Sequence, residues 1–473
     1  MDLYILPRTA LVVAVGALLL GWSLPGPRGL RLPLLAVALA AVLAAALSIN
    51  PWLSIAGAYT RYESVVVRLA YLGLFVGSAV LCRRPASREL ALRLFLAGCA
   101  VAGLEALWQG FRHELPRPDG NLGQPGLLGA LLAMALPVGL HIGLKDWRWL
   151  LALVPVAGGL YVSSSRSGWL GALAGGLVFL VLIAPARWRQ RALALAGALV
   201  LLAVVVVLLS PLRNLNQDTG GARVGVWSDS LRMVAARPLT GWGEDATGLM
   251  FGHFQTRDWE PGDTFDRIHD QPLDLLVAQG LLGAAALTWL LVAFARGVWR
   301  RPWAGPVAAC AAYLVWSLLN FDWAPATGAV WALAGLAWSY AQPPPPPSGR
   351  DLPALRGGVA LLGLLVGLLL AGPPLFADVA YHSGDPARAV ALDPLQARYH
   401  QALGEQRGSS SPQGLAELRR ARDLGDYDYS FLIELGDAER KDGHLAEARR
   451  AYQAALNVYP FDPMAPQRLR DLG

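Results

Sequence analysis

Long apolar stretches separated by short polar ones make up most of the first 375 residues. Each stretch has about twenty residues with few charges, which is enough for a helix to cross a hydrocarbon core of ~30 Å. Only structures that satisfy their own backbone hydrogen bonds can span a bilayer. The pattern therefore predicts an all-α, polytopic membrane protein with about twelve transmembrane helices, over residues 8–24, 30–48, 64–82, 90–109, 126–144, 148–163, 167–184, 192–210, 273–295, 304–320, 326–341 and 356–375.

Two polar intervals interrupt this pattern. The first, residues 211–271, is long enough to form a substantial loop at one membrane face. The second begins near residue 376, where charged residues become frequent and Ala, Leu and Tyr recur at helical spacing. We predict a transmembrane domain over residues 1–375, with the large loop as its working surface, and a small α-helical domain over residues 376–473. The proline-rich stretch 342–355 is predicted to be a stiff linker between two spans.

The tail carries a helical-repeat signal. Its second half has small and large residues at the positions of a tetratricopeptide helix-turn-helix unit, namely Leu432, Leu435, Gly436, Gly443, Ala448, Tyr452, Ala455 and Pro460. A weaker copy lies earlier, at Leu403, Gly404 and Ala416. We predict two or three degenerate repeats, and a generic helical hairpin remains the alternative.

Lys and Arg are distributed unevenly between the two alternating sets of loops. One set is rich in them and holds Arg28, Arg31, Arg83, Arg84, Arg88, Lys145, Arg148, Arg187, Arg189, Arg191, Arg296, Arg300, Arg301, Arg350 and Arg356. The short loops of the other set hold only Arg61, Arg112, Arg117 and Arg166. Since positive residues accumulate in cytoplasmic loops, we predict that the first set faces the cytoplasm and that the large loop and the tail lie outside. An even number of helices then places the N-terminus outside as well.

The composition agrees with a membrane protein and argues against a nucleic-acid partner. Hydrophobic residues make up 55% of the chain and charged residues 16%, whereas soluble domains have about 25% charged residues. The net charge is +6, but the arginines stand singly between apolar stretches, as orientation signals do. We therefore expect membrane lipid, and no nucleic acid, among the partners.

His269 is the first candidate for chemistry. It lies where the large loop meets the next membrane helix, between Arg267 and Asp270. Histidine accepts a proton near neutral pH, so a solitary His at a membrane-facing cleft is a plausible general base. Position alone also allows a structural interpretation, in which His269 caps the helix that starts near Pro272, and Asp270 is itself a good N-cap.

Two arginines are candidate ligands for an anion. Arg166 stands in the short turn SSSRSG between two apolar spans, where a charge close to hydrocarbon is costly and usually marks a site. Arg223 begins an amphipathic segment in which Val224, Trp227 and Leu231 share one helical face, so this helix is expected to lie along the membrane surface. Converging arginines suit a diphosphate. For each arginine taken singly, contact with lipid headgroups is the alternative.

The sequence lacks the motifs of several other classes of enzyme. The sequence has no GxSxG, no P-loop, no HExxH and no DxD or paired-carboxylate motif in the large loop. A metal-dependent glycosyltransferase is not supported by this pattern, and we expect neither a metal nor a cofactor.

Three segments carry a family resemblance. They are SSSRSGWLGALAGG from residue 163, ARVGVWSDSLRMVAARPLTGWG from residue 222 and HDQPLDLLVAQGLLGAAAL from residue 269. In this order they resemble the O-antigen ligase and Wzy polymerase superfamily, and the resemblance covers about residues 115–295. The sequence departs from the family pattern at Gln124-Pro125-Gly126 and at Asp270, where the family usually has Asn.

The resemblance implies a fold of the C-type glycosyltransferase class in the bacterial cytoplasmic (inner) membrane, with its site on the periplasmic or extracellular side. It implies transfer of a glycan from an undecaprenyl diphosphate carrier to an acceptor hydroxyl without a metal. On this pattern His269 would be the general base, and Arg223 and Arg166 would bind the diphosphate. We expect Arg267 as an additional diphosphate contact only because of its neighbourhood.

Several functions remain open. The acceptor could be a lipid A core, a second glycan or an exported protein, which correspond to a ligase, a polymerase and a protein O-oligosaccharyltransferase. Repeats in the tail favour a protein partner somewhat, because such repeats commonly present concave binding surfaces. A non-catalytic scaffold or transporter is less favoured, since charges in the middle of spans are few and Glu105 is the main exception.

Overall fold

The computed structural model describes residues 5–23, 26–188, 190–191, 194–195, 197–198, 220–342 and 353–472. All regular elements within these residues are helices, and no strand occurs among them. The predicted all-α class is confirmed.

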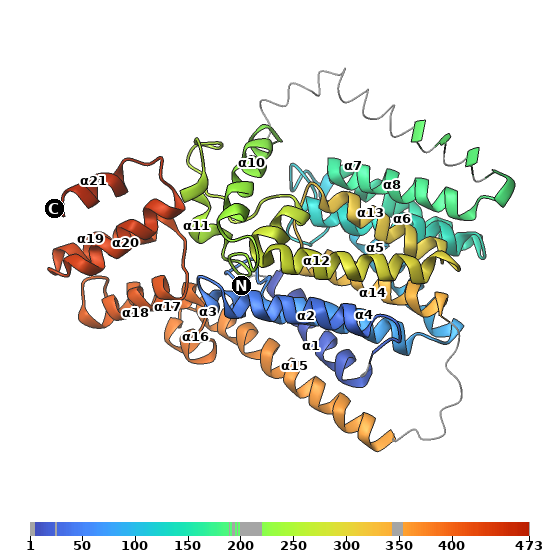
Figure 1. Ribbon diagram of the computed structural model, residues 1–473, viewed down its shortest axis with the longest axis horizontal. Helices are drawn as coiled ribbons and strands as arrows, with labels where there is room; N and C mark the ends of the chain where they lie inside the picture. Colours follow the sequence, from blue (N-terminus) through green and yellow to red (C-terminus); the bar gives the residue numbers. More distant parts are fainter. Residues whose placement is uncertain are drawn as a thin grey trace.

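Most of the helices before α16 lie side by side as a bundle, and α16 to α21 gather at one end of it (Figure 1). The bounds are α1 Ile5–Ser23, α2 Arg31–Ala46, α3 Pro51–Ala56, α4 Val65–Leu81, α5 Pro85–Phe111, α6 Pro125–Gly143, η1 Trp147–Ala152, α7 Leu153–Val162, α8 Arg166–Ile183, η2 Ala186–Trp188, α10 Gly220–Ala236, α11 Thr247–Phe254, α12 Gln271–Trp299, α13 Ala304–Ser317, α14 Ala324–Ala341, α15 Pro353–His382, α16 Pro386–Leu392, α17 Ala397–Arg407, α18 Pro412–Asp423, α19 Tyr429–Lys441, α20 Leu445–Val458 and α21 Met464–Arg470.

Eleven of the twelve predicted spans coincide with helices of the bundle. The remaining one, residues 192–210, lies mostly outside the described residues, as do the start of the predicted loop, up to residue 219, and most of the predicted linker. By length and composition, six described helices can cross a membrane: α1, α5, α6, α8, α12 and α15 from Gly357 onward. Four further apolar helices are shorter: α2, α4, η1 with α7, and α13. The chain is therefore a polytopic membrane protein.

Glycines let neighbouring helices of the bundle approach closely. A Cβ atom on Gly73 of α4 would lie 2.0 Å from the carbonyl oxygen of Gly16 in α1. A Cβ atom on Gly103 of α5 would lie 2.2 Å from the carbonyl oxygen of Pro155 in α7. Small residues at helix crossings are the usual way in which membrane helices gain packing contacts. Among the six long apolar helices, α6 is the most enclosed, so the core of the bundle lies around it.

The helix α12 is interrupted near its start. Gly280 has φ 63° and ψ −163°, a conformation that glycine adopts far more readily than other residues. A side chain there would also lie 2.4 Å from the carbonyl oxygen of Leu239. Backbone hydrogen bonds of 2.7–3.1 Å join the segment 238–243 to residues 277–282 on both sides of the kink. The turn that follows α10 is thus fixed to the helix that follows His269.

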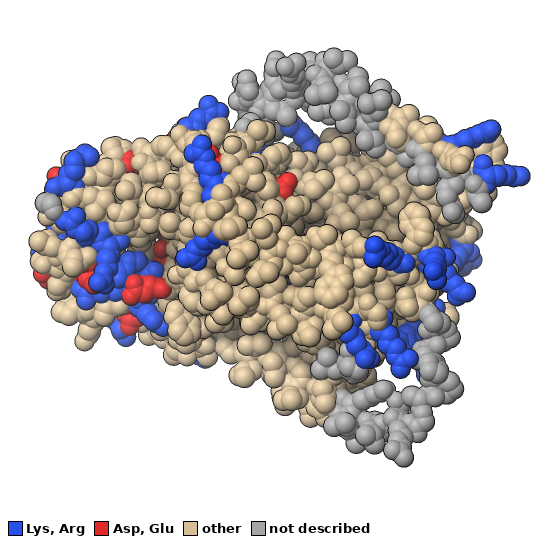
Figure 2. All heavy atoms as spheres, in the orientation of Figure 1, with Lys and Arg blue, Asp and Glu red and all other residues tan. Residues whose placement is uncertain are grey.

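The charged residues separate between the two ends of the bundle. Lys and Arg gather at the end of the bundle far from α16 to α21 (Figure 2). The end at which α16 to α21 lie carries both basic and acidic side chains. The order of the helices places Arg61, Arg112, Arg117 and Arg166 at the end where α16 to α21 lie, which we call the loop face. The Arg-rich set of loops lies at the opposite end, apart from Arg189 and Arg350, which are outside the described residues.

The C-terminal helices form pairs, α17 with α18 and α19 with α20. Ala448, Tyr452 and Ala455 lie on one buried face of α20, as the repeat pattern predicts. The ring of Tyr452 packs so closely on Gly436 of α19 that a Cβ atom there would lie 2.3 Å from it. This arrangement suits a generic hairpin as well, so the tetratricopeptide assignment stays a prediction. The predicted boundary at residue 375 falls inside α15, which continues to His382.

The amphipathic helix α10 exists, and it packs on the protein through the side opposite to the predicted apolar face. Its buried side includes Val226 and Met233, which are 1% and 0% exposed. Val224 and Leu231, which we predicted on the apolar face, are 66% and 55% exposed. α10 packs against α11 and α12 with the side that carries Val226, and contact of the exposed face with a membrane surface stays a prediction.

Candidate functional site

His269 lies at the loop face, in a short connection whose backbone is fixed on both sides. Its φ angle is 56°, in the left-handed region. The preceding residue, Ile268, donates its amide to Asp274 over 3.2 Å and accepts from the indole of Trp227 over 3.1 Å. On the other side, Asp270 caps α12 by accepting from the amide of Leu273 over 2.9 Å. The cap that we weighed for His269 is therefore supplied by Asp270.

An aromatic ring and an ion pair surround the imidazole. The ring of His269 meets the ring of Phe321 at 5.1 Å between centroids, with 72° between their planes. Phe321 is 4% exposed and belongs to the connection between α13 and α14. The guanidinium of Arg61 lies 5.1 Å from the same ring. It binds Asp266 with two hydrogen bonds, of 2.6 Å from Nε and 3.1 Å from Nη2.

Arg267 is deeply buried beneath His269. Its side chain is 3% exposed and forms ion pairs with Asp245 and, at 3.1 Å, with Asp274. Asp245 also accepts from the amide of Ala58 over 2.8 Å. Arg267 thus joins the loop after α10, the start of α12 and the turn before α4. Its predicted contact with a diphosphate remains a prediction, and this geometry makes a supporting role the simpler interpretation.

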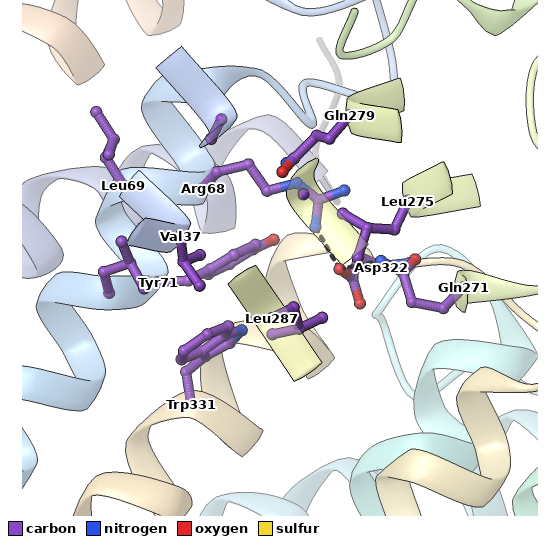
Figure 3. Close-up of a pocket in the computed structure, with 13 residues that line it drawn as sticks. Val37, Arg68, Leu69, Tyr71, Gln271, Leu275, Gln279, Leu287, Asp322 and Trp331 are labelled. Atoms are coloured by element: carbon purple, nitrogen blue, oxygen red, sulfur yellow. Dashed lines mark hydrogen bonds and ion pairs between the residues drawn. The ribbon is translucent and has the colours of Figure 1, made fainter. Parts of the chain in front are cut away.

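A second buried cluster lies deeper, around Arg68 of α4 (Figure 3). Its guanidinium contacts Asp322 and lies 3.4 Å from Glu244 and 4.0 Å from Glu63. The amide of Gln271 donates to Asp322 over 2.6 Å. Arg68, Gln271 and Asp322 also line a cavity of about 40 Å³ whose other walls are mostly apolar residues of α2, α4, α12 and α14. A buried charge is tolerated only when it is paired and hydrogen-bonded, and this arrangement meets that condition.

Glu63 is the carboxylate of the second cluster that lies 4.0 Å from Arg68. Burial raises the pKa of Glu63 to about 7, while the charge of Arg68 opposes the shift. The hydroxyl of Tyr71 donates to this carboxylate over 2.6 Å. The charge of Asp322 acts with burial and also raises the pKa of Glu63.

Arg223 and Arg166 lie at the same end of the bundle as His269. Arg223, in α10, donates from Nη1 to the carbonyl of Leu319, just beyond the end of α13, over 3.3 Å. Arg166 is the exposed first residue of α8. One turn below it, a Cβ atom on Gly171 would lie 2.7 Å from the carbonyl oxygen of Ala312 in α13. Both arginines therefore stand at the outer end of α13.

The electrostatic surroundings of His269 favour its neutral form. Burial lowers its pKa from the ordinary value of 6.5 to about 4, and the charge of Arg223 is the next cause. Arg61 lowers the pKa further, while Asp266 and Asp274 oppose the shift. At neutral pH the imidazole can therefore accept a proton. The structure brings Arg223, Arg61 and His269 within electrostatic range of one another.

We did not predict Arg61, Phe321 or the cluster around Arg68 as site residues from the sequence. For Arg61 a signal was available, because it is one of only four Lys or Arg residues in the short loops of its face. Asp322 offered another, as an acidic residue at a helix end. Phe321 offered none. Among the described residues, no group of three or more His, Cys, Asp or Glu side chains could hold a metal ion.

Comparison with known families agrees with the resemblance found in the sequence. Residues 151–288 match a family model described as O-antigen ligase. The matched segment contains Arg166, Arg223, Arg267 and His269. No match to a curated protein was found. At the level of the family, the match indicates a glycosyltransferase-type enzyme that uses a lipid-linked glycan and an acceptor.

Proposed function

Since residues 151–288 match the family model described as O-antigen ligase, we propose that the protein transfers a glycan from an undecaprenyl diphosphate carrier to an acceptor hydroxyl at the loop face. The observation that carries the proposal is the position of a neutral, half-buried His269 within reach of the charge of Arg223. A base and an anion ligand are the two groups that such a transfer needs.

In the proposed reaction His269 acts as general base. The acceptor hydroxyl loses its proton to the imidazole while its oxygen forms a bond to the anomeric carbon of the glycan. The bond from that carbon to the diphosphate oxygen breaks, and the electron pair leaves with the diphosphate. Proton transfer to a positioned base contributes typically 10²–10⁴-fold to the rate of such a step.

Arg223 and Arg166 are the proposed diphosphate ligands. Arginine forms bidentate hydrogen bonds with phosphate oxygens, and its charge stabilises the leaving group as negative charge develops on it. A bound diphosphate would also offset the charge of Arg223, which lowers the pKa of His269. The donor would thus make the imidazole a stronger base at the moment when it is needed.

Arg267 has a different place in the proposal. Its side chain is 3% exposed between Asp245 and Asp274, so an incoming phosphate would have to compete with two carboxylates. We propose that it supports the backbone on which His269 stands.

We also propose that the loop face lies on the periplasmic side of the bacterial inner membrane. The Lys- and Arg-rich end of the bundle would then face the cytoplasm, as the distribution of positive residues in membrane proteins favours. A carrier lipid held in the outer leaflet would present its diphosphate at the level of Arg166 and Arg223.

The test is glycan transfer by the purified full chain in detergent, with an undecaprenyl diphosphate-linked glycan as donor and EDTA present. Parallel reactions contain lipid A core, an excess of the donor itself or an exported protein as acceptor. We expect transfer by the wild type, and a loss of at least about a hundredfold in His269→Ala. His253→Ala, a change at an exposed histidine of α11, serves as the matched control and should retain activity.

The acceptor that is modified decides between a ligase, a polymerase and a protein O-oligosaccharyltransferase. Equal transfer by the wild type and by folded His269→Ala would show that the general base is wrong. An absence of transfer to all three acceptors would instead favour the non-catalytic scaffold or transporter.

A further inference from the structure

The C-terminal helical domain touches the loop that carries His269. Tyr427, in the turn between α18 and α19, donates its hydroxyl to Asp266 over 3.4 Å. Its ring lies 3.0 Å from the position that a Cβ atom on Gly248 of α11 would occupy. The same Asp266 carboxylate binds Arg61 through two hydrogen bonds. A residue 158 positions after His269 therefore contributes to its surroundings.

The domain contacts the loop face at several further points. Tyr459, at the end of α20, donates to Asp258 over 2.6 Å and accepts from the amide of Gly262 over 2.9 Å. The side-chain amide of Asn50 donates to the carbonyl of Asp423 over 3.0 Å. α11 and α20 lie side by side at this seam (Figure 1). The seam thus includes several contacts. Of the contacts named here, the one made by Tyr427 reaches the ion pair between Arg61 and Asp266 next to His269.

The ion pair is held from three sides. Arg61 stacks on Phe321 at 5.1 Å and on Trp323 at 5.0 Å from the ring centroids. Phe321 in turn meets the imidazole of His269 edge to face. Asp266 precedes His269 by three residues in the same connection. A shift of Arg61 would therefore displace both the ring against which His269 packs and the backbone that carries it.

We propose that Arg61 and Asp266 are positioning residues for His269, and that Tyr427 makes the C-terminal domain a working part of the site by holding their ion pair in place. This inference rests on the proposed role of His269 as general base. It assigns the domain a task at the reaction centre in addition to any partner that its outer surface binds.

The charges that face His269 make the proposal testable. They come from Arg223 of α10, from Arg61 of the turn before α4, and from Asp266 and Asp274 of its own connection and α12. Removing Arg61 leaves the negative charge of Asp266 unopposed, which raises the pKa of His269. Removing the charge of Asp266 leaves Arg61 unopposed, which lowers it. The two halves of one ion pair should therefore act in opposite directions.

The first measurement is the titration of His269 by NMR of the ¹⁵N-histidine-labelled full chain in lipid nanodiscs, with its signal identified by its loss in His269→Gln. We expect the midpoint to rise in Arg61→Gln and to fall in Asp266→Asn, each by roughly half a unit to one unit. Arg61→Lys keeps the charge and should leave the midpoint almost unchanged. Midpoints that stay put or move in the same direction in both variants would overturn the proposal, whether or not the protein is active.

The second measurement is the pH profile of kcat in the transfer assay. Arg61→Lys loses the planar double contact with Asp266, so its kcat should fall roughly tenfold while its acid limb stays in place. Tyr427→Phe removes only a hydroxyl and should lower kcat by roughly twofold to fivefold. Tyr459→Phe breaks a hydrogen bond of the same seam away from His269 and is the matched control.

Equal losses in Tyr427→Phe and Tyr459→Phe would mean that the domain only stabilises the fold, and the proposal for Tyr427 would be wrong. If the wild type transfers no glycan, the proposed function fails, and the NMR titration still decides whether Arg61 and Asp266 set the environment of His269.

Discussion

Two groups of arginines at the loop-face end of the bundle differ in their access to solvent. Arg267 and Arg68 are enclosed, with side chains 3% and 11% exposed and carboxylates on more than one side. Arg166 is exposed at the start of α8, and Arg223 is half-buried in α10. The same residue type therefore occupies two settings within one end of the bundle.

The difference shows how arginines that hold a site can be told from arginines that bind a substrate. An enclosed guanidinium has already exchanged its water for carboxylates, and removing it would leave those carboxylates buried and unpaired. An accessible guanidinium can still exchange its solvent for the oxygens of a phosphate. Substitution of an enclosed arginine should therefore cause loss of fold, and substitution of an accessible one loss of binding.

The largest expected effect is on stability and comes from Arg267→Ala. It leaves Asp245 and Asp274 without their shared partner in a buried site, and breaking such a pair costs about 3–5 kcal/mol. Thermal unfolding in detergent, followed by intrinsic fluorescence, should show a marked decrease in Tm or no folded protein. Arg450→Ala, which removes a side chain 67% exposed from an ion pair with Glu447, is the control. A Tm equal to the wild-type value in Arg267→Ala would contradict the supporting role.

A smaller effect, on binding, is expected from Arg223→Ala. Loss of one guanidinium from a diphosphate should reduce kcat/KM for the lipid-linked donor roughly tenfold to a hundredfold, with Tm close to wild type. Arg223→Lys should recover only part of this loss, since an ammonium group cannot make the bidentate contact. Arg232→Ala, at an exposed arginine of the same helix, should behave like the wild type. If Arg232→Ala lowers kcat/KM equally, the loss in Arg223→Ala comes from reduced positive surface charge, and a specific contact of Arg223 with the diphosphate is contradicted.

The pH dependence should follow the neutral imidazole. His269 has a pKa of about 4 in the folded protein and 6.5 as an ordinary value, and only its neutral form accepts a proton. The acid limb of kcat/KM, which reports the free enzyme, should therefore lie near pH 4. Arg223→Ala removes a charge that lowers this pKa, so its acid limb should lie at a higher pH. An acid limb near 6.5 in the wild type would contradict the buried, neutral His269.

The lowered pKa of His269 also predicts how the stability of the protein depends on pH. A histidine with a lowered pKa stabilises the folded state fully above its unfolded value, and this contribution is lost as the pH falls from about 6.5 to about 4. Part of the decrease in Tm over this range should therefore disappear in His269→Gln, which has no imidazole to protonate. An unchanged decrease would assign it to other groups.

The smallest effect is expected at Asp270. Its carboxylate accepts from the amide of Leu273 at the start of α12, and Asn is an equally good N-cap. Asp270→Asn should change the free energy of unfolding by only a few tenths of a kcal/mol, whereas Asp270→Ala should cost about 1 kcal/mol. Chemical denaturation of the purified protein can resolve this difference. Loss of glycan transfer in Asp270→Asn at unchanged stability would give Asp270 a role beyond capping.

Parts of the site were predictable because they follow from local sequence. The position of His269 at the start of a membrane helix, the cap at Asp270 and the turn before Arg166 all depend on neighbours within a few residues. The side of α10 that packs on the protein was not predictable from its own pattern. Val224 and Val226 are equally apolar, and only contact with α11 and α12 decides which of them is buried.

The sequence by itself determined the class of the protein, the course of eleven described spans and the family motifs, because a bilayer requires continuous apolar helices of a set length. Tertiary structure alone decided which charges meet. Arg61 and Tyr427 lie 208 and 158 residues from His269 along the chain, and no periodicity links them. They converge because the loops of one face are joined by the packing of the helices below them and of the C-terminal domain above. An arginine acquires its role from the carboxylates and solvent that surround it there.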